Sequence, residues 1–207
     1  MEILEIIFLS LAVSFTASFL SFILGFLISF FIFIKSFPFK KSIINFINAL
    51  TGVPTVIYGL IILLLLSRKG PLGSFSLLFT PSAIVIAQFA LLIPLIITLS
   101  LELFRGEGKI IIETCKILQI PKNKIPLVFI KELKKSLLTI FFLGFSRAIS
   151  EVGAVSLVGG NIKGSTRVMT TYIALSTSMG NYNTSIILGI VLFCISFSIS
   201  YILKRGN

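Results

Sequence analysis

The chain has 207 residues, of which 56% are hydrophobic and 12% charged, and its net charge is +11. A mean hydropathy of +1.10 excludes an ordinary soluble domain and predicts an integral membrane protein. The chain has no His and no Asp, and Cys115 and Cys194 are far apart, so the sequence indicates neither a metal site nor an enzyme nucleophile with its base. We therefore predict one all-α membrane domain over residues 1–207.

Five apolar stretches are long enough to cross a bilayer, which needs about 20 residues. The first has about 30 apolar residues, and its acidic start lacks the positive region of a removable signal peptide. Pro54 and Pro94 lie in the second and third stretches, where each could break a helix so that carbonyls line a pathway, or only kink it. The predicted spans are residues 5–34, 43–66, 81–104, 136–158 and 185–203.

The basic residues determine the predicted orientation. If the amino terminus lies outside, the positive-inside rule is satisfied, because the cytoplasmic segments then hold most of the Lys and Arg residues. The segment 105–135 is one of them, and the carboxyl terminus with Lys204 and Arg205 is another. This rule explains the net charge without a nucleic-acid partner. The basic residues left outside are Arg68, Lys69, Lys163 and Arg167.

The segment 105–135 combines charge with apolar periodicity. Ile111, Cys115 and Leu118 fall on one helical face, and Pro121 and Pro126 interrupt the pattern before it resumes. We predict short helices separated by a bend. Such helices need a partner surface or the bilayer interface, although a Lys-rich loop lying on anionic lipid is an alternative.

Arg147 and Glu151 lie near the middle of the fourth span. Each charge at the centre of a bilayer costs roughly 2.5 to 3.5 kcal/mol, so such charges usually face protein or water. Their i, i+4 spacing places them on one helix face, where they can pair. Gly144 and Ala154 continue that face and either admit a second helix or leave room for a pathway. Two interpretations stay open: an ion pair inside a helix interface, or a polar strip beside a translocation pathway.

The segment 159–184 is predicted to lie outside. Its apolar core, 168–175, is too short to span, so we expect a re-entrant or surface helix that closes an outer mouth. Asn161, Thr166 and Arg167 are candidate contacts for an external partner, although a plain helix exit and turn is an equal possibility for this region. The letters GGNIKGST lack the Gly-Lys-Ser order of a P-loop, so no nucleotide site is predicted.

Three stretches together resemble the permease subunits of oxyanion ABC importers, most of all tungstate permeases, then molybdate and sulfate permeases. They are LTGVPTVIYGLIILLLLSRKGPLG (50–73), LFTPSAIVIAQ (78–88) and FSRAISEVGAVSLVGGNI (145–162). The resemblance implies a type I importer in a prokaryotic cell membrane, with a homodimer of five-span permeases. It also implies two cytosolic ATPase subunits, which bind the ATP and Mg, and an extracytoplasmic oxyanion-binding protein.

The resemblance also assigns the ATPase-coupling residues. The family signature of Glu-Ala-Ala followed by Gly places Glu113, Thr114, Cys115 and Gln119 in the coupling segment, together with Ile120 and Pro121. Gln119 replaces the family's Gly. The alternative function is a secondary anion transporter or channel without an ATPase. For that class we would expect an inverted repeat or several acidic residues at mid-membrane, and the sequence has only Glu151 there.

Overall fold

The computed structural model describes residues 2–206, and the side chains of all of these except residues 2, 122, 200 and 202–206. The described chain is all-helical, as predicted, and contains no β-strand. The α-helices are α1 (Glu2–Ile34), α2 (Lys40–Thr51), α3 (Thr55–Leu66), α4 (Pro81–Leu103), α5 (Lys109–Ile117), α6 (Ile125–Glu132), α7 (Lys134–Ile149), α8 (Gly153–Gly159), α9 (Met169–Ser178) and α10 (Tyr182–Gly206). Of the basic residues predicted inside, Lys122, Lys204 and Arg205 have side chains outside the described part.

Within the described residues, three helices are long and apolar enough to cross a membrane, and two bent helix pairs raise this number to five if each pair is one span. The three are α1, α10 and α4 with its continuation into α5. The pair α2 and α3 bends by 99°, and the pair α7 and α8 by 59°. The five predicted stretches thus correspond to three helices and two bent pairs. A single continuous helix over 136–158 was a wrong expectation.

The two prolines behave differently. α2 ends at Thr51, and α3 begins directly after Pro54, so this proline lies at a helix break. Proline has no N–H to donate and disfavours helical backbone in the residue before it. Pro94, in contrast, lies buried inside the uninterrupted α4, so of the two alternatives the structure excludes a helix break at this residue. Membrane helices tolerate such a proline because neighbouring groups satisfy the freed carbonyl.

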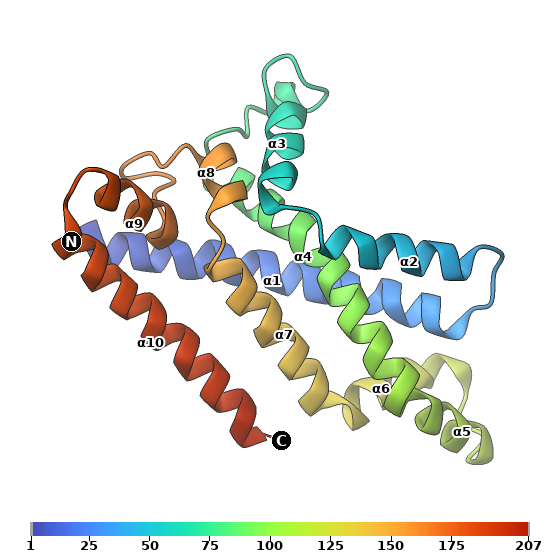
Figure 1. The fold of residues 1–207 in the computed structure, drawn as a ribbon. Coiled ribbons are helices and arrows are strands. Elements are labelled where there is room, and N and C mark those ends of the chain that lie inside the picture. The colour runs from blue at the N-terminus through green and yellow to red at the C-terminus, as the bar shows by residue number, and fades with distance from the viewer. Residues whose placement is uncertain (1, 207) are drawn as a thin grey trace.

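α4 forms the centre of the molecule, and α1 packs along it (Figure 1). Small residues on α1 allow the close approach: a Cβ on Gly25 would lie 2.7 Å from Ile96 Cγ2 of α4. The side chains of Ser14, Ser18 and Ser21 are likewise buried on this face of α1. Small residues let membrane helices approach closely, so that van der Waals packing replaces the hydrophobic effect that lipid does not supply.

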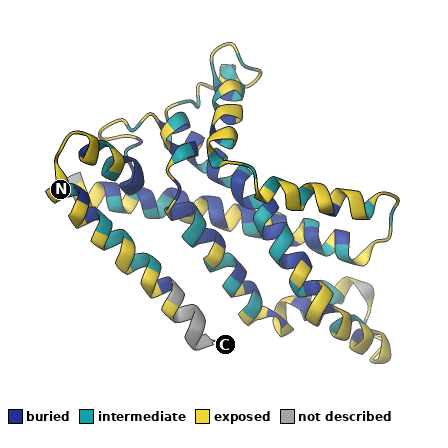
Figure 2. Cartoon of the chain, in the orientation of Figure 1, coloured by how far each residue is buried: buried dark blue, intermediate teal, exposed yellow. Residues whose placement is uncertain are grey.

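Both α3 and α10 carry many exposed residues (Figure 2), and several of these residues are large and apolar. On α10, Ile190 and Phe193 are more than half exposed, and on α3 Leu64 is as well. Such surfaces are unfavourable in water and favourable against lipid or another membrane helix. The arrangement is that of a membrane subunit.

The predicted short helices in 105–135 are present as α5 and α6, with a turn between them. The segment does not begin with a bend, however, because a π-helical turn, Phe104–Gly108, continues α4 into α5. Phe129 of α6 is fully buried, with ring contacts to Phe30 of α1 and to Phe104. These aromatic contacts attach α6 to the end of α1. The first turns of α1 and α9 lie at the other end of the molecule from α5 (Figure 1).

Candidate functional site: a charged pair at a broken membrane helix

Polar side chains gather at the break between α7 and α8. Ser150 follows the last residue of α7, and its hydroxyl donates to the carbonyls of Ser146 (2.9 Å) and Arg147 (3.1 Å). Such back-bonding from serine bends helices. The chain leaves the helix over Ser150 to Val152 and starts α8 at Gly153.

Glu151 lies in this break and is 2% exposed. Its Oε2 accepts from Arg147 Nη1 at 3.1 Å, and its Oε1 accepts from the backbone N–H of Ala154 at 3.2 Å. The hydroxyl of Thr170, in α9, donates to the backbone carbonyl of Glu151 at 2.8 Å. The carboxylate therefore satisfies one of the unpaired N–H groups that begin α8, in the direction that the helix dipole favours.

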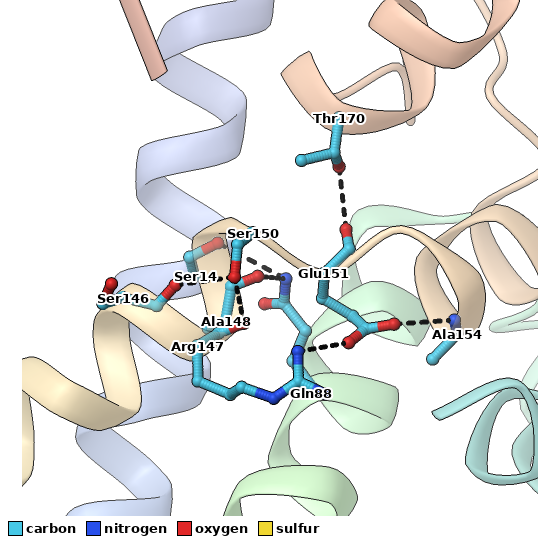
Figure 3. A network of polar contacts seen from close by, with 9 residues as sticks. All are labelled: Ser14, Gln88, Ser146, Arg147, Ala148, Ser150, Glu151, Ala154 and Thr170. Atoms are coloured by element: carbon cyan, nitrogen blue, oxygen red, sulfur yellow. Dashed lines mark hydrogen bonds and ion pairs between the residues drawn. The ribbon is translucent and has the colours of Figure 1, made fainter. Parts of the chain in front are cut away.

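Arg147 occupies the last turn of α7, and its side chain is 41% exposed. The predicted pair forms, but not on one helix face, because Glu151 lies outside the helix. One partner is buried and bonded to α8, whereas the other reaches the surface of the chain. Figure 3 shows the guanidinium beside the Glu151 carboxylate, with Gln88 next to it.

Sequence reasoning missed Gln88, which ties the break to two other helices. Its Nε2 donates to the carbonyl of Ala148 at 2.9 Å and to Ser14 Oγ of α1 at 3.3 Å. The Gln88 side chain is 2% exposed in α4. A lone amide in an otherwise apolar span was the available signal, because such a group needs a partner in a membrane. The result is a polar network that joins α1, α4 and α7 (Figure 3).

The predicted coupling residues lie on α5 and the turn after it. Glu113 and Thr114 are exposed, whereas Cys115 is 2% exposed. Gln119 has φ of 51°, a left-handed conformation that glycine adopts without strain. The glycine of the signature that the resemblance implies would adopt this backbone conformation without strain. Gln119 has a Cβ and adopts it at an energetic cost. A groove of about 630 Å³ runs between the end of α1 and this segment, and Glu113, Gln119 and Ile120 help to line it.

Similar proteins were found by comparing the whole sequence. The chain is 44% identical over 202 residues to the tungstate uptake system permease protein TupB of Peptoclostridium acidaminophilum, covering 98% of this chain and 89% of that protein. It is 37% identical to the TupB of Campylobacter jejuni, covering 82% and 71%. It is also 35% identical to a probable anion ABC transporter permease protein of Haloferax volcanii, covering 78% and 72%. This chain belongs to the anion permeases of ABC transporters. No protein-family model matches it.

The fold of this permease agrees with that assignment. It resembles a chain of the MetNI methionine ABC transporter, solved in inward-facing conformations, with a TM-score of 0.62 over 100% of this chain and 96% of that one. The sequence identity is only 13%, so the likeness concerns the fold. The permease is a transport subunit, and the family resemblance that we drew from the sequence is confirmed.

The small residues predicted beside the charged pair are buried in the permease. Ala154 of α8 packs against Gly59 of α3, where a Cβ on Gly59 would lie 2.6 Å from Ala154 Cα. Gly144 faces Ile96 of α4. Both therefore serve close helix packing within this chain.

The segment 159–184, which we predicted to lie outside, contains the expected short helix, α9. Thr166 is fully buried: its hydroxyl donates to the Gly159 carbonyl and accepts from the Ile162 N–H. Its hydroxyl is therefore used inside this chain, and a contact of Thr166 with an external partner stays a prediction.

The other two candidates of this segment also contact α9. Asn161 exchanges hydrogen bonds with Thr171, and the Arg167 guanidinium lies 4.6 Å from the ring centroid of Tyr172. Both side chains are half-buried. They hold the turn after α8 against α9, and a contact with an external partner stays a prediction for these two residues.

Proposed function

We propose that this permease is the membrane subunit of an ABC importer that carries tungstate, or the related oxyanion molybdate, into the cytoplasm. The observation that carries the proposal is the 44% identity to a tungstate permease over 98% of the chain. The 37% identity to a second tungstate permease supports it. Sulfate is the next candidate.

In the proposed complex, two copies of this chain form the pathway, two cytosolic ATPase subunits bind ATP and Mg, and an extracytoplasmic protein delivers the oxyanion. The amino terminus lies outside the cell membrane of a prokaryote, and α5 and α6 lie in the cytoplasm. Two observations support an ATPase on α5: Glu113 and Thr114 are exposed, and a groove of about 630 Å³ opens beside them. ATP-driven motion of the ATPases would then rock the spans between outward and inward access.

The charged pair suggests how the pathway treats a dianion. Glu151 is buried and bonded to α8, whereas the Arg147 side chain is 41% exposed. In the proposal, Arg147 lowers the electrostatic barrier to the anion as it crosses. Glu151 partly neutralises that charge, so the anion is attracted but not held. Pro54 lies at the other helix break and stays a candidate for the pathway.

The decisive experiment reconstitutes the permease in proteoliposomes with its ATPase and binding protein. ATP hydrolysis is then measured with tungstate, molybdate or sulfate. We expect tungstate or molybdate to stimulate ATP hydrolysis. We also expect the anion to move from the side of the membrane that holds the binding protein to the side that holds the ATPase. Stimulation by sulfate alone would overturn the substrate. Anion flux without ATP would instead indicate a channel or secondary transporter.

A further inference from the structure

A second groove is lined by residues of α1, α6 and α7. Its volume is about 490 Å³. Among the described residues that line it, Lys134 is the single charged one, and the rest are apolar. Several of these apolar side chains are exposed, including Leu27 (56%) and Leu138 (54%). The lining is Phe22, Ile23, Phe26, Leu27, Pro126, Ile130, Lys134, Leu137 and Leu138.

The groove faces away from the charged pair. Leu138 and Arg147 are both in α7 and lie nine residues apart, which is about two and a half turns, so they point to opposite sides of the helix. Lys134 lies one turn before Leu138, on the side of the groove. If Arg147 faces the pathway, the groove faces the surrounding bilayer. This position favours a lipid over the transported anion or the second permease copy.

The charge and shape define the chemistry of that lipid. Lys134 is the first residue of α7, at the end of the molecule that carries α6. Lys131 and Lys135 are exposed beside it, as is Glu132, so the local charge is positive. A lysine buries its apolar stem and extends its ammonium group to the membrane interface. Basic pockets between membrane helices bind anionic lipid headgroups. The stretch of α1 that lines the groove, from Phe22 to Leu27, is about 8 Å long at 1.5 Å per residue. That length fits only the first part of an acyl chain.

We propose that this groove binds an anionic phospholipid, with the beginning of one acyl chain between α1 and α7 and the headgroup phosphate on the Lys134 ammonium. Pro126 and Ile130 place the groove directly on α6. Phe129 attaches the same helix to α1 through the buried aromatic cluster. A bound lipid would therefore brace the segment proposed to meet the ATPase. This site goes beyond the proposed function; its position against the bilayer rests on the proposed pathway face of Arg147, but it does not depend on which oxyanion is carried.

Native mass spectrometry of the purified permease tests the site, with phosphatidylglycerol and phosphatidylcholine of identical acyl chains as probes. We expect phosphatidylglycerol to bind in preference to phosphatidylcholine. Lys134→Gln should lower its retention roughly fivefold, the contribution of one lysine near an anionic surface. The control Lys135→Gln, at an exposed lysine that does not line the groove, should retain it. Equal loss in both variants, or equal binding of both lipids, would overturn the proposal.

A second pair of variants tests the acyl part of the groove. Leu27→Trp fills the groove, whereas Leu24→Trp alters an exposed α1 side chain, 42% exposed, that does not line it. Leu27→Trp should reduce phosphatidylglycerol binding several-fold at an unchanged melting temperature, and Leu24→Trp should not. If Leu27→Trp instead separates the permease dimer, the groove is a protein interface and the lipid proposal is wrong.

Discussion

Glu151 Oε1 accepts a hydrogen bond from the backbone N–H of Ala154 at 3.2 Å, so the acidic member of the charged pair begins the helix that follows it. The same carboxylate binds Arg147 through Oε2. One side chain thus connects the end of α7 to the start of α8. This double contact satisfies both carboxylate oxygens at a helix break inside a membrane, whereas Oε1 of the neighbouring Gln88 is buried without a hydrogen-bond partner among the described residues.

The two members of the pair should respond differently to substitution. Glu151→Ala removes a buried partner and leaves the α8 N–H unpaired, so we expect a loss of about 3 kcal/mol in unfolding free energy. This corresponds to roughly 6 to 12 °C in melting temperature. Arg147→Gln leaves the buried Glu151 carboxylate with an amide donor in place of its cation, so we expect a smaller loss of about 1 to 2 kcal/mol, or roughly 2 to 8 °C in melting temperature.

Melting of the purified permease and ATP-dependent uptake should be measured for both variants. In Arg147→Gln we expect normal membrane levels and at least a roughly fivefold loss of uptake, since a ΔΔG of about 1 kcal/mol is about that factor. Normal uptake in Arg147→Gln would show that the arginine is structural at most.

The contact between α3 and α8 should not tolerate a larger residue. Gly59→Val places a branched side chain where even a Cβ would lie 2.6 Å from Ala154 Cα. We expect a destabilisation of about 1 to 3 kcal/mol from overpacking. Gly189→Val is the control, because a Cβ at Gly189 of α10 would have no described atom within 4 Å beyond its chain neighbours and the nearby backbone of its own helix. Thermal melting of the two variants should differ clearly, and equal values would contradict the close α3–α8 contact.

Gln119 should be a site where glycine stabilises the coupling segment. Its φ of 51° is unfavourable for a residue with a Cβ, and relief of this strain is worth about 1 to 2 kcal/mol before the entropy of glycine in the unfolded chain is subtracted. We expect Gln119→Gly to raise stability by about 0.5 to 1 kcal/mol. Lys116→Gly, inside α5, should lower it by about 1 kcal/mol. The melting temperatures of the two glycine variants test this prediction. A lower melting temperature in both variants would refute it.

Thr166 should be structural. Thr166→Ala removes the hydroxyl that bonds Gly159 and Ile162, so we expect a loss of about 1 kcal/mol, or roughly 2 to 4 °C in melting temperature. Ser165→Ala, at the exposed neighbouring residue, should leave the melting temperature unchanged. Binding of the oxyanion-binding protein, measured alongside, should be the same in both. Loss of that binding in Thr166→Ala alone would show that Thr166 takes part in the contact with the binding protein.

Much of the fold was predictable because the underlying signals are local. The apolar stretches identified the spans, and the prolines and periodicity of 105–135 identified α5 and α6. The i, i+4 spacing correctly paired Arg147 with Glu151. Each of these follows from residues close together in the chain, whose free energies depend mainly on their own side chains and on the bilayer.

The tertiary structure decided which polar groups are satisfied and where helices break. α7 ends before Ser150, and the backbone groups beyond it find partners in the tertiary structure. The Glu151 carboxylate accepts from the Ala154 N–H, and the hydroxyl of Thr170, in α9, donates to the Glu151 carbonyl. Pro94 is buried among packed neighbours and stays inside a helix. Pro54 is exposed and lies at a helix break. Gln88 is essential to the network only because α1 and α7 bring acceptors to it. The sequence by itself determined the membrane domain and its charged pair. The packing of distant helices determined what that pair does, since in lipid a polar group has only the protein to bind.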